Sequence, residues 1–193
     1  MDSLMKLISV WSRKGGASKT TLALNLAGLA SSKGLKVLLI DDDPQGSSTW
    51  LAERGRLPFE VMSSWPNERP TEFDVVFVDY PPRTDDTPAG DTVIIPYRPT
   101  ALDFSAVSSF ITKLSETKKV IEVVTQLDRR LKEPMEFAID KKSKGAHWMV
   151  NRSVYQRAAS EATTVFDPNF SNISGSREAR TELEIIFREA MNE

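Results

Sequence analysis

A glycine-containing segment near the amino terminus combines the residue types that bind phosphate groups. It follows an apolar run at residues 7–10 and reads Lys14-Gly15-Gly16-Ala17-Ser18-Lys19-Thr20-Thr21. A turn of this kind between a strand and a helix offers backbone N–H groups and the positive end of the helix dipole to an anion. Lys19 is expected to neutralise the β- and γ-phosphates of a nucleotide, and the Thr20 hydroxyl to ligate Mg²⁺. A plain Gly-Gly turn beside two exposed lysines is the competing interpretation.

Carboxylates follow two further apolar runs. The run at residues 37–40 leads into Asp41-Asp42-Asp43-Pro44-Gln45-Gly46-Ser47, and the run at residues 73–78 leads into Asp79-Tyr80-Pro81-Pro82. Phosphoryl transfer needs carboxylates that hold Mg²⁺ and orient water. An Asp-Pro turn after a strand is common in isolation. Three such motifs in this order within one domain nevertheless favour ATP binding.

Alternating strands and helices must position these motifs. Runs rich in β-branched residues predict buried strands, at residues 7–10, 37–40, 75–78, 92–95 and 135–139. Apolar residues spaced by three or four predict helices, at residues 22–30, 107–114, 120–131 and from 176 onward; the second and third of these are either two short helices or one long one. Gly34 is expected at the end of the first helix and Ser176 as the N-cap of the last. Residues 54–71 contain three prolines and are predicted to form a surface loop.

This alternation predicts an α/β fold, with a mostly parallel sheet, helices on both faces and a site at the carboxyl ends of the strands. The 193 residues suffice for one compact domain, 1–193. The chain contains no cysteine, which excludes disulfides, thiolate metal sites and iron–sulfur ligation. No apolar stretch reaches about 18 residues, so a soluble, cytoplasmic protein is expected. Because the net charge is −2, any nucleic-acid contact must come from a local patch.

The three motifs together resemble those of the ParA/MinD family of P-loop ATPases, and the chain looks closest to small ParA-type partition ATPases. The first segment is similar to the deviant Walker A box of the family, K-G-G-x-G-K-[ST], and departs from it only at Ser18. The strict P-loop pattern is not met, because Arg13 and Ser18 stand at its two glycine positions. The other motifs are similar to D-x-D-P-Q-G and h-h-h-h-D-x-P-P. The resemblance implies a P-loop NTPase type of fold and slow, Mg²⁺-dependent, partner-stimulated ATP hydrolysis.

The resemblance also implies roles for individual residues. Lys14 is expected to reach across a homodimer to the phosphates of the other subunit, so that ATP binding and dimerisation are coupled. Asp43 is expected to orient the attacking water, Asp41 to support the nucleotide and Asp79 to hold Mg²⁺ through water. The implied catalytic residues are Lys14, Lys19 and Asp43. The implied metal-binding residues are Thr20, Asp43 and Asp79. The implied nucleotide-binding residues are Lys14, Gly15, Gly16, Ala17, Ser18, Lys19, Thr20, Thr21, Asp41, Pro96 and Arg98.

Two departures from the family pattern bear on these roles. The side chain of Ser18 stands where glycine normally lets the backbone approach the phosphates, so weaker nucleotide binding or slower turnover is expected. Asp140 occupies the predicted end of a strand where the family usually has asparagine, so the preference for one base is not predicted by the sequence.

Arginines late in the chain resemble the region with which ParA dimers contact nonspecific DNA. They are Arg152, Arg157, Arg177 and Arg180. Phosphate contact needs only a few guanidinium groups, and dimerisation doubles their number. Ion-paired arginines on amphipathic helices are the competing interpretation. The resemblance implies a nucleoid-associated homodimer that segregates plasmid or chromosome DNA with a ParB-like centromere-binding or adaptor protein. The acidic end of the tail argues against membrane recruitment.

Several alternatives stay open. The cargo could be a protein assembly instead of DNA. A small-molecule ATP-dependent synthetase of the dethiobiotin type shares the fold and the P-loop. A binding module in which Ser18 has disabled hydrolysis is a third alternative, and separate measurements of ATP binding and hydrolysis discriminate it. The single histidine, His147, has no second histidine or cysteine with which to form a metal site and is assigned no role.

Overall fold

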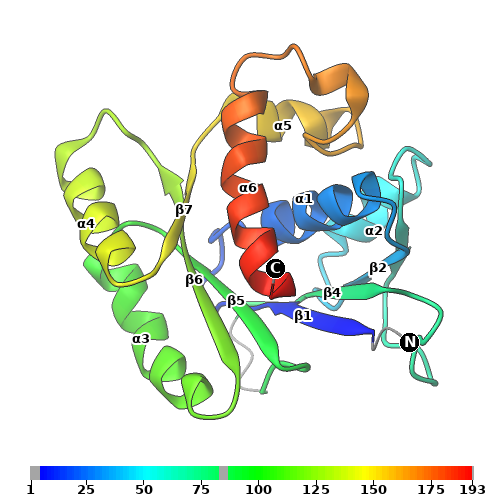
Figure 1. Ribbon diagram of the computed structural model, residues 1–193, viewed down its shortest axis with the longest axis horizontal. Helices are drawn as coiled ribbons and strands as arrows, with labels where there is room; N and C mark the ends of the chain where they lie inside the picture. Colours follow the sequence, from blue (N-terminus) through cyan, green and yellow to red (C-terminus); the bar gives the residue numbers. More distant parts are fainter. Residues whose placement is uncertain (1–4, 83–86, 193) are drawn as a thin grey trace.

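A single parallel sheet forms the centre of the molecule (Figure 1). The computed structural model describes residues 5–82 and 87–192. Within them the sheet has seven strands in the order β3-β2-β4-β1-β5-β6-β7. The strands are β1 (Lys6–Val10), β2 (Val37–Asp41), β3 (Glu60–Met62), β4 (Val75–Asp79), β5 (Thr92–Tyr97), β6 (Lys119–Leu127) and β7 (His147–Val150). The helices are α1 (Lys19–Ser32), α2 (Ser47–Ala52), α3 (Ala101–Ser115), α4 (Lys132–Ser143), α5 (Ser153–Ser160) and α6 (Ser176–Met191), with a 3₁₀ turn at Pro168–Phe170.

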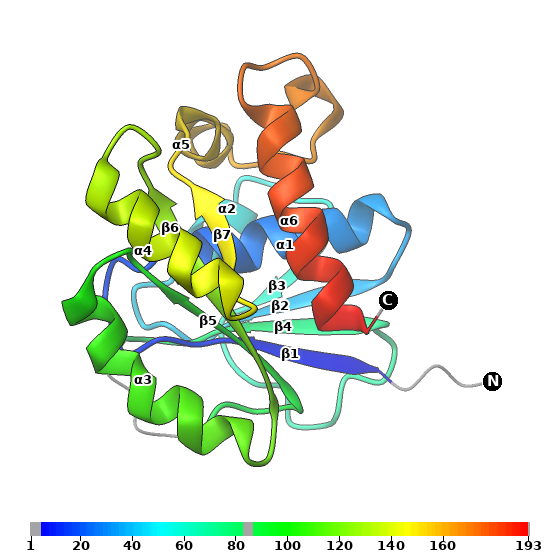
Figure 2. The same ribbon diagram turned by 60° about the vertical axis from the view of Figure 1, so that its left-hand side comes forward.

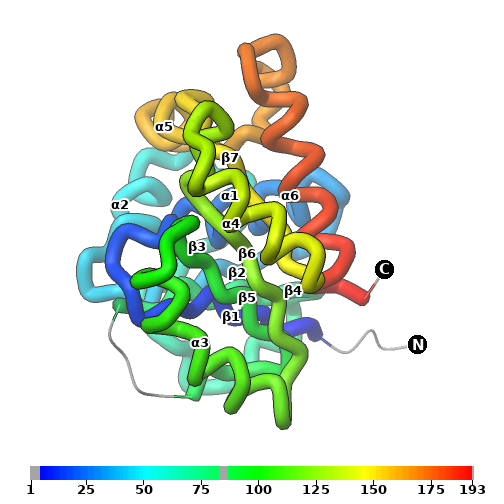
Figure 3. Tube along the Cα trace, turned by 90° about the vertical axis from the view of Figure 1, so that its left-hand side faces the viewer, coloured from blue at the N-terminus to red at the C-terminus, as the bar shows by residue number. Residues whose placement is uncertain are grey.

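Helices cover both faces of this sheet (Figure 2). On one face, α1, α5 and α6 bury residues such as Leu26 and Phe187. On the other face, α3 and α4 bury residues such as Val107 and Ala138, and Figure 3 views the molecule from this side. The α/β class and the two-sided covering of the sheet are therefore as the sequence predicts. None of the helices within the described residues is long and apolar enough to cross a membrane.

The strand order brings three loops to one edge of the sheet. β4 lies between β1 and β2, and its last residue, Asp79, pairs in register with Val10 of β1 and with Asp41 of β2. The carboxyl ends of parallel strands lie at the same edge. The loops after β1, β2 and β4, which carry the three motifs, therefore meet there.

One predicted helix is a strand. The apolar spacing of residues 120–131 predicts a helix, but Lys119–Leu127 form β6. β6 lies between β5 and β7 and is covered by helices on both faces. A strand covered on both faces loses the alternation of apolar and polar residues that marks a half-exposed strand. Its remaining apolar spacing then resembles that of a helix.

One predicted strand is part of a helix. The run at residues 135–139 lies inside α4, where Ala138 is fully buried. Glu133 in the first turn and Lys141 in the last turn suit the dipole of a helix. Asp140 consequently lies on α4, where it pairs with Lys144 at 2.8 Å, and does not end a strand.

Smaller corrections concern element boundaries. Gly175, with φ of 82°, is the N-cap of α6, and the predicted cap, Ser176, is the first residue of the helix. Glycine adopts this left-handed conformation without the steric cost that a side chain brings. The stretch predicted as a loop at residues 54–71 contains the edge strand β3. The sequence does not indicate β7, because a strand of four residues is too short to show a clear pattern.

Candidate nucleotide site

The loop after β1 enters α1 through two left-handed residues. Gly16 has φ of 71°, and Ser18, the N-cap of α1, has φ of 63°. The predicted phosphate-binding residues from Gly15 to Thr21 form this loop and the first turn of α1. The first N–H groups of a helix have no partner within the helix. They are therefore available to an anion at the carboxyl edge of the sheet.

Lys19 is almost completely buried beside the acidic residues of the site. Its side chain donates a hydrogen bond from Nζ to the carbonyl oxygen of Lys14 at 3.2 Å. Burial lowers the pKa of Lys19, and the carboxylates of Asp79 and Asp43 oppose that shift. Lys19 thus lies among negative charges in a position suited to neutralise the phosphates of a nucleotide.

Asp79 is the most unusual acidic group of the site. It is completely buried, and neither carboxyl oxygen completes a hydrogen bond. Burial raises the pKa of Asp79 to about 7, and the neighbouring carboxylate of Asp41 adds to the rise, whereas the Thr20 hydroxyl and the Lys19 ammonium oppose it. A buried carboxylate whose oxygens complete no hydrogen bond is costly unless a cation approaches it.

The other two carboxylates are anchored by the backbone. Asp41 is buried, and its Oδ2 accepts hydrogen bonds from the backbone N–H and the hydroxyl of Thr49, at 2.8 and 3.0 Å. Its Oδ1 is buried without a partner. Asp43 is half-buried, and its Oδ1 accepts from the backbone N–H of Gln45 at 3.0 Å.

The donor set fits Mg²⁺ bound together with a nucleotide. Thr20, Asp43 and Asp79 offer oxygen atoms, which Mg²⁺ prefers, and the buried oxygens of Asp79 complete no hydrogen bond. Within the described ranges, no group of three or more His, Cys, Asp or Glu side chains is arranged to hold a metal by itself. Mg²⁺ commonly binds through one or two protein oxygens together with phosphates and water, so the fit depends on the nucleotide.

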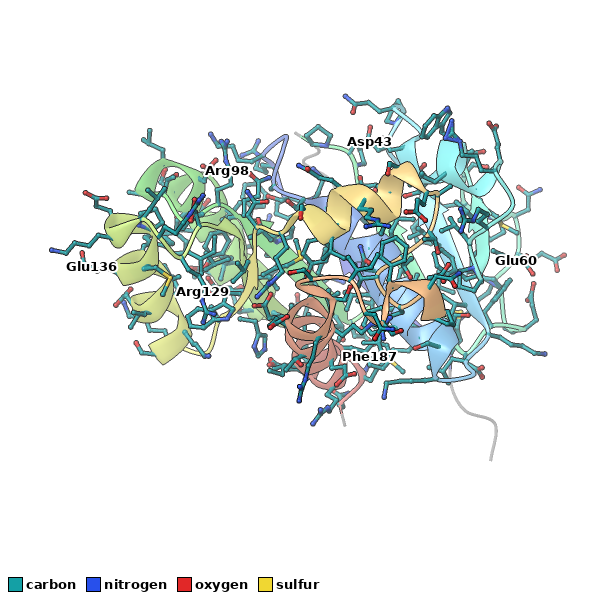
Figure 4. The ribbon with its side chains drawn as sticks, turned by 90° about the horizontal axis from the view of Figure 1, so that it is seen from above. Asp43, Glu60, Arg98, Arg129, Glu136 and Phe187 are labelled. Atoms are coloured by element: carbon teal, nitrogen blue, oxygen red, sulfur yellow. The ribbon has the colours of Figure 1, made fainter. Side chains whose placement is uncertain are left out.

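Lys14 lies on the other side of the loop, beside the amino terminus of α3. Its Nζ is 3.9 Å from Oδ1 of Asp103. The two carboxyl oxygens of Asp103 also accept one hydrogen bond each from Arg98, at 3.0 Å to Oδ2 and 3.2 Å to Oδ1. Although burial raises the pKa of Asp103, hydrogen bonds from Arg98 and Thr100 lower it below its usual value. Figure 4 shows Arg98 and Asp43 along the same edge of the molecule.

The residues around Lys14 border a cavity of about 480 Å³. Arg98, a predicted nucleotide-binding residue, lines this cavity. Pro96 does not, because β5 continues to Tyr97 and buries Pro96 within the sheet. A larger cavity, of about 660 Å³, lies between α1, α2 and α5 and has Thr20 and Gln45 in its lining.

The four arginines predicted to contact DNA differ in their surroundings. Arg152 forms a two-point ion pair with Glu182, and Arg180 donates hydrogen bonds to the backbone carbonyls of Val165 and Asp167. Arg157 is exposed and pairs with Glu161 at 3.2 Å. Arg177 is exposed at the start of α6.

Sequence reasoning missed three side chains around the loop. Asp103 anchors Arg98, and Thr125 and Gln126 at the end of β6 donate hydrogen bonds to the loop. Thr100 caps α3 by accepting from the backbone N–H of Asp103. A Thr-x-x-Asp pattern ahead of an apolar helix could have indicated Asp103. No local pattern could have indicated Gln126, which is 110 residues from Gly16 along the chain.

Relatives in sequence cover part of the chain. The maintenance of carboxysome distribution protein A of Gloeobacter kilaueensis is 37% identical over an alignment of 119 residues, and the match covers 54% of this chain and 54% of that protein. The chromosome-partitioning ATPase Soj of Thermus thermophilus is 47% identical over 45 residues, 23% of this chain and 18% of that protein. The matches thus span about half of the first relative and less than a fifth of the second.

Solved structures share the fold over nearly the whole chain. A plasmid partition protein from Borrelia burgdorferi bound to AMPPNP has a TM-score of 0.72 at 20% identity and covers 95% of this chain and 99% of its own. The ATP complex of McdA from Cyanothece has a TM-score of 0.70 at 17% identity and covers 98% and 97%. The family of CobQ/CobB/MinD/ParA nucleotide-binding domains matches residues 8–164. This chain therefore belongs to the CobQ/CobB/MinD/ParA nucleotide-binding family.

Proposed function

We propose that this chain is an ATP-dependent dimerising ATPase that segregates or positions a cargo, with plasmid or chromosome DNA as the favoured cargo. The observation that carries the proposal is the buried carboxyl group of Asp79, whose oxygens complete no hydrogen bond, beside Lys19 and the amino terminus of α1. This arrangement supports binding of a magnesium nucleotide. The names of the relatives, which refer to carboxysome distribution and chromosome partitioning, support the positioning role.

The proposed mechanism assigns one task to each side chain. Lys19 and the first N–H groups of α1 bind the phosphates. Asp43 orients the attacking water, and Lys14 acts on the nucleotide of a second subunit, which couples ATP to dimerisation. Thr20, Asp43 and Asp79 would hold Mg²⁺, which neutralises phosphate charge when bound.

The catalytic part of the proposal is tested by separating binding from turnover. Asp43→Ala is expected to keep binding Mg-AMPPNP in calorimetry, with a small loss of affinity because Thr20 and Asp79 still hold Mg²⁺. It should lose about 100-fold in ATP hydrolysis, because orientation of water affects turnover more than affinity. Lys19→Ala, which removes the ammonium group proposed to bind the phosphates, is the control that should lose binding of Mg-AMPPNP. Unchanged hydrolysis by Asp43→Ala, with and without a stimulating partner, would eliminate Asp43 as the catalytic carboxylate.

The proposed DNA contact rests on the exposed arginines, Arg177 and Arg157. Arg152 and Arg180 bind partners within the protein. Their proposed role is to stabilise the α5–α6 region that carries the contact. Binding should ignore DNA sequence and fall steeply with salt, because phosphate contacts release counterions. A ParB-like adaptor protein is the proposed partner that stimulates hydrolysis.

A fluorescence anisotropy titration with a duplex of random sequence tests this contact. In the ATP state, a plot of log affinity against log salt has a negative slope. Arg177→Ala should make this slope shallower by about 0.9 for each phosphate that a subunit no longer neutralises. Arg188→Ala, an exposed arginine further along α6, is the matched control and should leave the slope unchanged. If the wild type with ATP binds no DNA at low salt, a protein cargo becomes the better proposal.

The larger cavity favours a second candidate function, a small-molecule ATP-dependent synthetase. The cavity of about 660 Å³ is large enough for a metabolite, and its lining includes Trp50 and Tyr155 together with uncharged polar groups. Thr20, a predicted magnesium ligand, borders it. ATP turnover that requires an added metabolite, and that Lys14→Ala leaves unchanged, would favour the synthetase over the dimeric switch.

A further inference from the structure

Ser18 holds a backbone conformation that favours glycine. It is the N-cap of α1, with φ of 63° and ψ of 29°. In this left-handed region a side chain crowds the backbone, so residues other than glycine adopt it when their surroundings hold them there. Ser18 also stands at a glycine position of the phosphate-binding pattern. A contact that holds Ser18 is therefore required.

Gln126 provides such a contact from the end of β6. Its Nε2 donates hydrogen bonds to the carbonyl oxygen of Gly16 at 2.5 Å and to Oγ of Ser18 at 3.1 Å. Gln126 is itself left-handed, with φ of 53°, at an irregularity in the pairing of β6 with β7. Two left-handed residues other than glycine thus meet through one carboxamide.

Neighbouring hydrogen bonds extend this contact along the loop. The hydroxyl of Thr125 donates to the carbonyl oxygen of Ala17 at 3.0 Å. The C=O and N–H groups of a planar trans peptide point in opposite directions. Because the carbonyls of Gly16 and Ala17 are bound toward β6, the N–H groups of Ala17 and Ser18 point away from β6. Such N–H groups are the donors with which this type of loop binds anions.

We propose that Gln126 is a positioning residue for nucleotide binding, which holds Ser18 in the left-handed conformation that glycine would adopt unaided. The proposal rests on the proposed binding of ATP. Gln126 acts through the loop: without its carboxamide, Ser18 relaxes toward ordinary backbone angles and turns its N–H away from the phosphates. With glycine at position 18, the loop needs the carboxamide much less.

A double-mutant cycle tests this coupling. The four proteins are the wild type, Gln126→Met, Ser18→Gly and the double variant, and calorimetry measures their affinity for Mg-AMPPNP. Gln126→Met keeps the length of the side chain and removes the donor. It should weaken binding at least tenfold when residue 18 is serine and less than threefold when it is glycine. Gln156→Met, at an exposed glutamine on α5, is the matched control. It should leave the affinity for Mg-AMPPNP unchanged whether residue 18 is serine or glycine.

A second measurement needs no nucleotide. In nucleotide-free protein, Gln126→Met should accelerate hydrogen exchange of backbone amides in residues 14–20 but not in residues 22–30, which lie in the interior of α1. Thermal denaturation identifies any variant that loses affinity by unfolding. Faster exchange confined to the loop at unchanged melting temperature supports the proposal.

The outcomes separate this inference from the proposed function. Wild-type protein that fails to bind Mg-AMPPNP would overturn both. Wild-type binding that Gln126→Met leaves unchanged would overturn the positioning role alone. Equal reductions of affinity in the serine and glycine backgrounds would also overturn it, because Gln126 would then act on the ligand directly or through another part of the protein.

Discussion

The ion pair between Arg152 and Glu182 joins the start of α5 to α6. Nη1 and Nη2 of Arg152 donate to the two carboxyl oxygens of Glu182, at 2.6 and 2.9 Å. The side chains are only 12% and 11% exposed. Glu182 also accepts the backbone N–H of Val150 at 3.1 Å, which ties β7 to the same group. Removing the arginine leaves a buried carboxylate without its cation.

We predict that Arg152→Ala destabilises the protein strongly. Breaking a buried pair by removing one partner costs about 3 to 5 kcal/mol, because the remaining charge is uncompensated. The lower figure applies here, since both side chains retain some contact with water. A decrease of about 3 kcal/mol corresponds to a fall of roughly 6 to 12 °C in melting temperature for a chain of this size.

Urea denaturation followed by circular dichroism measures this decrease. The exposed Arg177→Ala is the matched control and should stay within about 0.5 kcal/mol of the wild type. Arg152→Met combined with Glu182→Leu should recover part of the stability, because an apolar pair can replace a buried ion pair, while the N–H of Val150 loses its acceptor. If Arg152→Ala unfolds within about 0.5 kcal/mol of the wild type, the pair is not structural and Arg152 returns as a candidate for DNA contact.

Two further predictions concern the core of the site and the packing of α1. In metal-free protein, Asp79→Asn should be more stable than the wild type at pH 8 and similar at pH 4. The pKa of Asp79 rises from 3.8 to about 7 on folding. The wild type therefore loses stability as the pH rises through this interval, by about 4 kcal/mol in total. If the stabilities of the two proteins change with pH in parallel, the prediction is wrong. Gly28→Ala should cost about 1 to 3 kcal/mol in urea denaturation, because a Cβ at Gly28 would lie 2.3 Å from Oγ1 of Thr164; wild-type stability would contradict the close packing.

The part of the site that could be predicted from the sequence is the part encoded locally. The phosphate-binding loop and Asp43 follow apolar strands and Asp79 ends one, so a short motif specifies both the residue and its position. Parallel strands then bring the motifs to one edge without further information. The fold class follows in the same way from the alternation of strands and helices.

The contacts between distant segments could not be predicted. Gln126 reaches Gly16 only because β6 folds beside the loop. Arg152 and Arg180 look like free guanidinium groups in the sequence, yet their partners are supplied by α6 and by residues 165 and 167. The sequence of β6 itself resembles that of a helix, because burial on both faces removes the alternation that identifies a strand.

The measurement that tests the central claim most directly is the molar mass of the protein with nucleotide, determined by light scattering after size exclusion. With Mg-AMPPNP, the wild type should have twice the monomer mass, and without nucleotide it should be monomeric. Lys14→Ala should bind Mg-AMPPNP in calorimetry and yet remain monomeric, because Lys14 is proposed to act on the nucleotide of the other subunit. A nucleotide-dependent dimer of Lys14→Ala, or a wild type that binds nucleotide and stays monomeric, would contradict the account.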